Sequence, residues 1–295
     1  MNRPPTILLF GAGGQVGRAL VPRLRAIGRV VPMDRTQVDI EDAGAIRSAI
    51  LRERPSLVVN AAAYTAVDAA ESDADRCFAV NRRAPGAMAR ATAETGGAIL
   101  HFSTNYVFDG ISTDPYVEAA PRCPINVYGA SKAGGEVAVE KGNPAHLIIR
   151  TSAIFSRHGR NFLERILALA RDREELQIVS DQLVSPTGAT TLAGAAVAAA
   201  SLVLGPGADP SVYGTYHVTC AGAVSWFDFA REILSGDPGR ATQRCRMVRP
   251  VSSTEYPTVA RRPLNGVLDT SKFATRFAHP LPHWRDDLRR VLEQV

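Results

Sequence analysis

A tyrosine and a lysine four residues apart are the first pair in this sequence whose types and spacing could do chemistry. Tyr128 and Lys132 lie in NVYGASKAGGE at 126–136, where the flanking residues favour a helix. Positions i and i+4 share one helix face, which places the ammonium beside the phenol. A cation there would stabilise the phenolate and let the phenol act as a general acid. A surface phenol beside a surface ammonium is the alternative that the spacing alone leaves open.

Lysine is rare in this chain, which gives Lys132 additional weight. Lysine and arginine together number 34, yet only Lys132, Lys141 and Lys272 are lysines. Arginine therefore occupies nearly every basic position. A lysine placed one helical turn from a tyrosine indicates a chemical purpose.

A glycine-rich turn follows the first predicted strand, 6–10, and opens the first predicted helix. Within FGAGGQVG, the residues Gly11, Gly14 and Gly17 fit GxxGxxG. In that pattern the first glycine permits a tight turn, the second lets a pyrophosphate approach, and the third packs helix on strand. Gln15 and Val16 begin the helix, whose N-terminus offers N–H groups to a phosphate. The position in the chain predicts a dinucleotide site, and an ordinary glycine turn is the alternative.

An acidic and a basic residue end the second predicted strand, 29–34. Asp34 stands where an acid accepts the adenosine ribose hydroxyls of NAD, and Arg35 could instead meet the 2′-phosphate of NADP. Asp39 and Ile40 are predicted to flank the adenine. The predicted cofactor is therefore NADPH or NADH without a strict preference. A plain loop carboxylate is the alternative for Asp34.

Apolar strands alternate with helices through the first half of the chain. Further strands are expected at 56–63, 98–104 and 146–152, and helices at 16–27, 41–53, 73–95, 161–172, 192–204 and 226–234. This alternation predicts an α/β protein of the Rossmann type, a doubly wound parallel sheet with a smaller C-terminal substrate-binding lobe. We expect residues 1–151 to form the dinucleotide-binding domain and 152–295 to form mainly the lobe. Segments of the lobe that return to the sheet are left open.

Composition excludes several classes of function. The chain has 295 residues, 21% charged residues and a net charge of +5, without a long basic run, so nucleic acid is not an expected partner. Its four cysteines show no CxxC or metal-ligand spacing, which predicts reduced thiols in a cytoplasmic protein. The most apolar window, 192–204, is too short to cross a bilayer, and no signal peptide is expected. No membrane partner is therefore expected.

Four motifs in one order resemble the extended short-chain dehydrogenases/reductases: the glycine loop, NAAA after the third strand, ST ending the fourth, and YxxxK on the next helix. Longer stretches are similar to the dTDP-4-dehydrorhamnose reductase family: NAAAYTAVDAAE at 60–71, STNYVFDG at 103–110, DQLVSPT at 181–187 and YPTVARRP at 256–263. The resemblance implies NAD(P)H-dependent reduction of the 4-keto group of dTDP-4-dehydro-L-rhamnose to dTDP-L-rhamnose. A different dTDP-4-keto-6-deoxy sugar and a non-catalytic regulatory or binding subunit of the same fold are the alternatives.

The resemblance also implies roles for individual residues. Tyr128 would protonate the sugar carbonyl oxygen, Lys132 would hold the nicotinamide ribose and acidify the tyrosine, and Thr104 would hydrogen-bond to the reacting oxygen. Further cofactor-binding residues would be Ala62, Ala63, Tyr64, Thr65 and Ser103. Substrate-binding residues would be Asn105, Tyr106, Ala153, Asn161, Gln182 and Arg262, with Arg262 clamping the diphosphate. The alternatives are turn or capping roles for Asn161 and Gln182 and a solvated surface position for Arg262. His101, on an apolar strand, is expected to be a core histidine and not a catalyst.

Some positions depart from the family pattern. Asn105 replaces a usual aspartate, Ala153 a common tryptophan, and Gly266 a typical serine. Some relatives dimerise around a metal held by glutamates, but Thr190 and Thr191 cannot supply those carboxylates, although Glu293 remains. We therefore expect no metal, and a monomer or weak homodimer.

Overall fold

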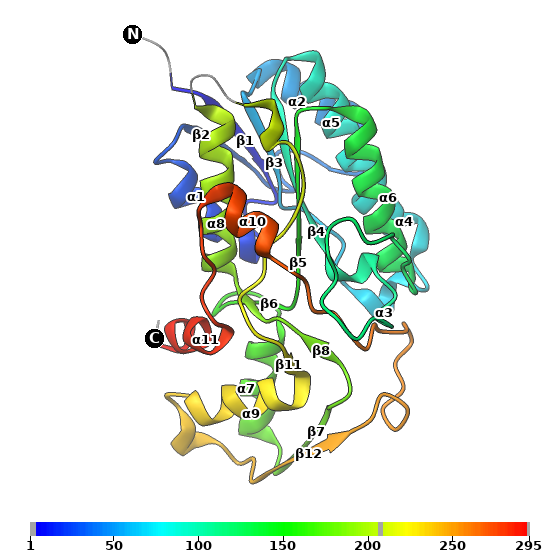
Figure 1. Cartoon of the computed structure of the whole chain (residues 1–295), viewed down its shortest axis with the longest axis vertical. Helices are drawn as coiled ribbons and strands as arrows, with labels where there is room; N and C mark the ends of the chain where they lie inside the picture. Colours follow the sequence, from blue (N-terminus) through cyan, green and yellow to red (C-terminus); the bar gives the residue numbers. More distant parts are fainter. Residues whose placement is uncertain (1–3, 206–208, 294–295) are drawn as a thin grey trace.

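Six parallel strands form the centre of the protein. The computed structural model describes residues 4–205 and 209–293 (Figure 1). The strand order is β10-β5-β4-β3-β1-β2. The bounds are β1 (Thr6–Phe10), β2 (Arg29–Met33), β3 (Leu57–Asn60), β4 (Ala98–Thr104), β5 (His146–Thr151) and β10 (Gly214–His217). The predicted doubly wound parallel sheet is confirmed.

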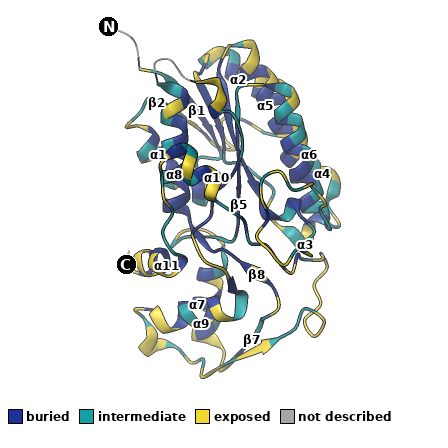
Figure 2. Cartoon of the chain, viewed as in Figure 1, coloured by how far each residue is buried: buried dark blue, intermediate teal, exposed yellow. Residues whose placement is uncertain are grey.

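Helices cover both faces of this sheet because its strands are apolar on both sides. On one face, Ile7 and Leu9 pack with α1 (Gln15–Leu24) and α8 (Ala189–Leu204). On the other face, Leu8 and Phe10 pack against α2 (Ala43–Glu53), α5 (Ala84–Glu94) and α6 (Val127–Gly142). Figure 2 shows the central strands buried between these layers, whereas the edge strand β2 has exposed positions.

The helix expected at 73–95 is instead three segments. They are α4 (Ala74–Phe78), a π-helical turn at Ala79–Arg83, and α5. Pro85 has no N–H to donate to the carbonyl of Asn81, so the α-helical ladder breaks there. The freed carbonyl faces Gly135 of α6, where an added Cβ would lie 2.1 Å from it. The interruption therefore lets α6 approach closely.

The second half of the chain builds a lower lobe around its own core (Figure 1). Its helices are α7 (Phe162–Asp172), α9 (Trp226–Gly236) and α11 (Trp284–Leu292). Short strand pairs complete it: β6 (Ile154–Phe155) with β9 (Thr187–Gly188), β8 (Leu183–Val184) with β11 (Val224–Ser225), and β7 (Glu175–Val179) with β12 (Met247–Val251). The same half also sends α8 and β10 to the sheet, where β10 pairs with β5.

Parallel strands bring their carboxyl ends to one edge of the sheet, which faces the lower lobe. Gly11, Asp34, Ala61 and Ser103 follow or end strands at this edge. The chain passes from β1 to β2 in one direction along the sheet and from β3 to β4 in the other. Ligands of doubly wound sheets bind at such a switch point. Within the described residues, no helix has the length and apolar character needed to cross a membrane.

Candidate active site

Tyr128 and Lys132 lie on the first two turns of α6. The Asn126 side chain caps this helix, accepting from the Gly129 N–H at 2.7 Å. A Cβ on Gly129 would stand 2.2 Å from the Tyr106 carbonyl oxygen, so glycine lets the helix start against residues 105–107. This contact brings Tyr128 to the end of β4, where Thr104 lies.

The Tyr128 phenol is held among other polar and aromatic groups. The Tyr106 ring meets it edge to face, with ring centroids 5.5 Å apart. Burial raises the pKa of Tyr128, and the Thr104 hydroxyl partly opposes that shift. The phenol therefore carries its proton at neutral pH, as a general acid must.

Lys132 faces the core of the sheet. Its Nζ donates to the Phe102 carbonyl oxygen at 2.5 Å and lies 3.5 Å from His101 Nε2. The side chain is buried, and burial lowers the pKa of Lys132 to about 8, against the charge of Glu136. Burial and the side chains of Thr104, Tyr106 and Cys77 shift the pKa of Tyr128, and Lys132 is not among these causes. The acidification of Tyr128 by Lys132 therefore stays a prediction.

The glycine turn has the shape that a pyrophosphate site needs. Gly11 has φ +79°, and a Cβ there would lie 2.5 Å from the Ala62 nitrogen. A Cβ on Gly17 would lie 2.1 Å from the Gly11 oxygen, so both positions require glycine. Gly14 precedes α1, and the space beside Gly13 is open. Backbone N–H groups at this helix start can face a diphosphate.

Among the residues that the structure describes, two buried hydroxyls near the sheet edge lack hydrogen-bond partners, those of Thr151 and Ser152 at the end of β5. The Ser103 hydroxyl at the end of β4 instead bonds to Glu136 and lowers the pKa of that carboxyl. Unpaired buried hydroxyls are costly unless a ligand satisfies them. Together with the glycine turn, the two unpaired hydroxyls fit a dinucleotide site at this edge of the sheet.

The residues predicted at the adenosine end are exposed. Asp34 Oδ1 accepts from the Thr36 N–H at 2.8 Å and the Thr36 hydroxyl at 2.5 Å. These bonds to Thr36 lower the pKa of Asp34, so the carboxylate is charged. Arg35 and Asp39 are exposed beside it, and Ile40 is partly buried against the core under α2.

The loop after β3 is fixed by two asparagines. The Ala62 N–H donates to Asn60 Oδ1 at 3.1 Å. Tyr64 is held at both backbone groups by the Asn81 side chain, at 2.9 and 3.0 Å. Ala63 and Tyr64 are half-buried and Thr65 is exposed. The loop is thus placed against the glycine turn at Gly11.

Arg262 is tied to the acid Asp68. Its two terminal nitrogens lie 3.0 and 2.9 Å from the two Asp68 carboxylate oxygens, a bidentate pair. The Arg262 charge also opposes the rise in the pKa of Tyr106 that burial causes. Arg262 is therefore beside the Tyr128–Tyr106 pair and is not a freely solvated surface group, although its diphosphate role stays a prediction.

Asn161 and Gln182 lie apart from Tyr128's immediate neighbours. Asn161 caps α7 by accepting from the Glu164 N–H at 3.2 Å, and its Nδ2 donates to Gln15 Oε1 at 3.0 Å. Asn161 therefore has the capping role and also joins the lower lobe to the glycine turn. Gln182 is buried and donates to the Ser253 hydroxyl at 2.8 Å.

Two departures from the family pattern, Asn105 and Gly266, touch each other. Asn105 is buried, and a Cβ at position 266 would stand 2.3 Å from its Nδ2. Glycine at 266 thus makes the room that the amide fills. The third departure, Ala153, has φ +44°, an uncommon conformation for alanine.

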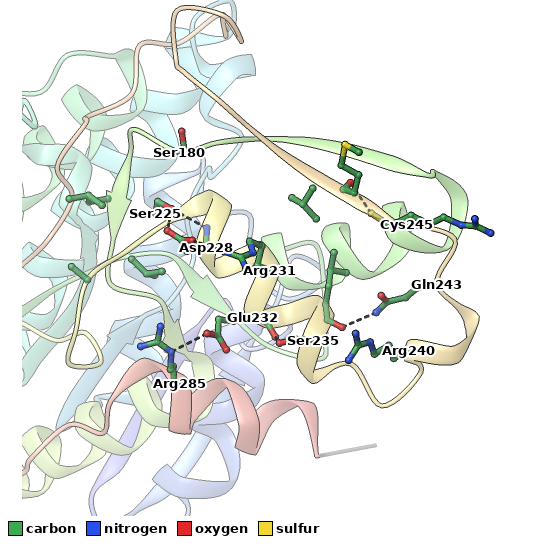
Figure 3. A pocket seen from close by; sticks show the side chains of 17 residues that line it. Ser180, Ser225, Asp228, Arg231, Glu232, Ser235, Arg240, Gln243, Cys245 and Arg285 are labelled. Carbon is green, nitrogen blue, oxygen red and sulfur yellow. Dashed lines mark hydrogen bonds and ion pairs between the residues drawn. The ribbon is translucent and has the colours of Figure 1, made fainter.

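A separate cavity of about 720 Å³ opens in the lower lobe (Figure 3). None of the predicted site residues lines it. Its Arg285 and Glu232 pair at 3.2 Å, and its Arg231 and Asp228 pair at 3.6 Å. Two further arginines line the cavity, so basic side chains outnumber acidic ones there. Among the residues that the structure describes, no cluster of three or more His, Cys, Asp or Glu side chains could hold a metal.

Comparison with known proteins decides the family. The model of the RmlD substrate binding domain matches residues 5–295. This chain belongs to the RmlD family. It is 44% identical to the dTDP-4-dehydrorhamnose reductase of Burkholderia thailandensis over 95% of both chains. It is 37% identical to that of Escherichia coli K12, over 98% of this chain and 97% of the other.

Solved structures of RmlD relatives share the whole fold. A dTDP-4-dehydrorhamnose reductase from Bacillus anthracis, in complex with NADP, has a TM-score of 0.89 at 32% identity, covering 99% of both chains. One from Clostridium acetobutylicum has a TM-score of 0.89 at 31% identity, covering 98% of both.

Sequence reasoning missed the groups beneath Lys132 and beside Arg262. His101 was expected only in the core, and Asn60 and Asp68 were not singled out. The sole sequence signal for Asn60 and His101 is that each is a polar residue on an apolar strand.

Proposed function

We propose that this chain reduces the 4-keto group of dTDP-4-dehydro-L-rhamnose to dTDP-L-rhamnose with NADPH or NADH. The observation that carries the proposal is the protonated Tyr128 phenol next to Thr104, with Lys132 on the next turn, at the edge that also holds the glycine turn. The RmlD family membership supports the substrate class.

Each side chain has a defined task in this reaction. A bound nicotinamide supplies hydride to the carbonyl carbon. Tyr128 gives its proton to the carbonyl oxygen, and Thr104 donates a hydrogen bond to the same oxygen. Lys132 directs its ammonium at the cofactor ribose, and its charge favours the phenolate that Tyr128 leaves behind.

The remaining site residues divide between the two ligands. We propose that Gly11, Gly14, Gln15, Val16 and Gly17 hold the diphosphate of the cofactor, with Ser103 and residues 62–65 along its length. Asp34, Arg35, Asp39 and Ile40 would surround the adenosine. Asn105, Tyr106, Ala153, Gln182 and Arg262 would contact the dTDP-sugar, and Asn161 would act at the boundary with the glycine turn.

The proposed division of labour follows the two halves of the chain. Residues 1–151 would bind the cofactor and 152–295 mainly the sugar nucleotide, with α8 and β10 as the segments that complete the sheet. We further propose a monomer or weak homodimer that works in the cytoplasm, where its four cysteine thiols would stay reduced.

A different dTDP-4-keto-6-deoxy sugar is the second candidate substrate, and Ala153 and Asn105 favour it. An alanine methyl in place of an aromatic wall widens the space near the sugar, and an amide in place of a carboxylate changes which hydroxyls it can bind. A non-catalytic subunit would need no acid such as Tyr128, so it is the weaker alternative.

The test supplies purified protein with NADPH and dTDP-4-dehydro-L-rhamnose and follows the loss of NADPH absorbance. Chromatography against authentic dTDP-L-rhamnose identifies the product. We expect stoichiometric NADPH oxidation and that product. NADPH binding without oxidation of it by any dTDP-4-keto-6-deoxy sugar would instead support the non-catalytic subunit.

A further inference from the structure

A chain of buried polar groups runs through the sheet to Lys132. Asn60 on β3 and His101 on β4 are register partners in adjacent strands, and both are fully buried. Asn60 Nδ2 lies 3.0 Å from His101 Nδ1, and His101 Nε2 lies 3.5 Å from Lys132 Nζ. The order is therefore Ala62 N–H, Asn60, His101, Lys132.

The first bond in this chain fixes the direction of all the others. The Ala62 backbone N–H can only donate, so it must meet the Asn60 carbonyl oxygen, at 3.1 Å. The Asn60 NH₂ group then points at His101 and can only donate. His101 Nδ1 must accept, and a neutral imidazole that accepts at Nδ1 carries its proton on Nε2. Complete burial and the charge of Lys132 lower the pKa of His101 well below its ordinary value, so the ring is neutral.

An N–H from His101 therefore faces the ammonium of Lys132. Two donors cannot bond, and their separation of 3.5 Å is longer than the roughly 2.7–3.2 Å of an ordinary hydrogen bond. The ammonium bonds instead to the Phe102 carbonyl oxygen at 2.5 Å. If His101 Nε2 carried a lone pair instead, it would accept a second hydrogen bond from the Lys132 ammonium inside the core.

We propose that Asn60 and His101 are positioning residues for Lys132: Asn60 fixes the Nε2–H tautomer of His101, and this N–H keeps the remaining ammonium protons of Lys132 directed at the cofactor. This inference rests on the proposed function, because the direction of the ammonium matters only where a nicotinamide ribose binds. Both side chains are fully buried, so they would act on the cofactor only through Lys132.

The tautomer is measured directly by NMR on protein with ¹⁵N-labelled histidine rings, without cofactor or sugar. The His101 signals are assigned by their loss in His101→Gln. We expect a neutral ring protonated at Nε2. A ring protonated at Nδ1, or an imidazolium at neutral pH, would overturn the proposal.

Fluorescence titration with NADPH then separates positioning from packing. Gln at 101 can accept from Asn60 and donate toward Lys132, so His101→Gln should bind NADPH nearly as wild type does. Asn60→Asp cannot donate to His101, so the ring should take its proton at Nδ1 and offer a lone pair to Lys132. One ammonium proton is then captured, and affinity should fall by roughly 2–10-fold, the equivalent of one hydrogen bond.

Equal losses in His101→Gln and Asn60→Asp would show that the pair only fills the core. If Asn60→Asp does not fold, Asn60→Leu replaces it: Leu removes the donor to His101 Nδ1, so the ring can take its proton there and accept from Lys132, and the same comparison with His101→Gln decides. Both measurements omit the sugar, so a failure to reduce dTDP-4-dehydro-L-rhamnose would count against the proposed function and leave this test standing.

Discussion

The surroundings of the Tyr128 phenol make it harder to ionise, so it keeps its proton at neutral pH, the state that the proposed general acid needs. Burial raises its pKa, and the hydroxyl of Thr104 moderates the rise. The pair could be predicted from the sequence because YxxxK on a helix after an ST-ended strand needs only local spacing. The contact between Asn60 and His101 beside Lys132 could not be predicted. The register that pairs these two residues across β3 and β4 does not follow from the sequence of either strand alone.

Replacing Tyr128 with phenylalanine removes the proton and keeps the ring. We expect Tyr128→Phe to lower kcat by about 10²–10⁴-fold, the usual contribution of a positioned general acid. NADPH affinity, measured by fluorescence titration, should stay within about twofold, because the phenol is not a phosphate ligand. Near-normal turnover at saturating substrate would assign the acid to another residue.

In the proposed cofactor site, Asp34 would set the balance between NADH and NADPH. Its carboxylate can accept ribose hydroxyls of NADH and also repels the 2′-phosphate of NADPH. Asp34→Ala should therefore weaken NADH binding and leave NADPH binding equal or tighter, in titrations of both cofactors. An equal loss for both would remove Asp34 from the adenosine site.

Gly266 and Asn105 should behave as a coupled pair. A Cβ at 266 would stand 2.3 Å from Asn105 Nδ2 and 3.2 Å from the Leu183 oxygen. Gly266→Ala should lower the free energy of unfolding by about 1–3 kcal/mol, the usual cost of overpacking. Chemical denaturation measures this cost, which should shrink in an Asn105→Ala background.

Gly194 is the matched control, since a Cβ there meets nothing within 4 Å and lies within α8. Gly194→Ala should be neutral or stabilising. A cost for Gly266→Ala that is the same with and without Asn105 would show that the two sites are independent.

At the scale of elements, one buried carboxylate links α11 of the lower lobe to α8, which packs on the sheet. Asp287 accepts from the Gly188 N–H at 2.8 Å, the Thr191 hydroxyl at 2.6 Å and the Cys220 thiol at 3.1 Å. These donors come from β9, α8 and the segment after β10, so one side chain joins four parts of the chain. Thr191, which departs from the glutamate-bearing relatives near this position, is used here as a donor to Asp287.

Asp287→Ala leaves three donors unpaired inside the protein. The free energy of unfolding should fall by about 2–4 kcal/mol, because bonds to a charged group are among the stronger ones. Asp286→Ala, on the same helix but exposed and paired with Arg289 at 3.3 Å, should cost less than about 0.5 kcal/mol. Similar losses for the two variants would show that Asp287 does not anchor α11.

Some elements could be predicted from the sequence, and the others could not, for a physical reason in each case. Strands β1 and β4 were predictable because each contains an apolar run, ILLF in β1 and AIL in β4, next to turn residues. The π-helical turn follows from Pro85, but the fit of Gly135 of α6 against the freed Asn81 carbonyl is a contact that no local pattern reveals. Strand β10, four residues with only a partial apolar character, is a strand because β5 offers it an edge.

At the scale of the whole molecule, buried neutral histidines tie stability to pH. His217 is fully buried, and its Nε2 lies 3.3 Å from Arg150 Nη1. Burial and the Arg150 charge lower the pKa of His217 to about 3. In the unfolded chain the same ring takes a proton near its ordinary pKa of about 6.5. The unfolded state thus binds more protons between these values, so stability is fully present above about pH 6.5 and falls as pH decreases toward 3.

His217→Gln should flatten that acid slope. The measurement is the free energy of unfolding by denaturant at several pH values between about 7 and 4, for the variant and wild type. The exposed His158→Gln serves as control and should reproduce the wild-type slope. An unchanged slope in His217→Gln would show that other groups carry the acid sensitivity.

Because β10 pairs with β5 and comes later in the chain, the edge of β5 stays open for a defined time during synthesis. All strands up to β5 have been made once residue 151 leaves the ribosome, but the edge of β5 stays open until residues 214–217 follow. At ordinary elongation rates of about 5–20 residues per second, that interval lasts roughly 3–13 s. During it the nascent chain carries an unpaired apolar edge of the kind that recruits other strands. The growing chain therefore has a defined period in which a holdase chaperone would protect it, and that period ends when β10 arrives.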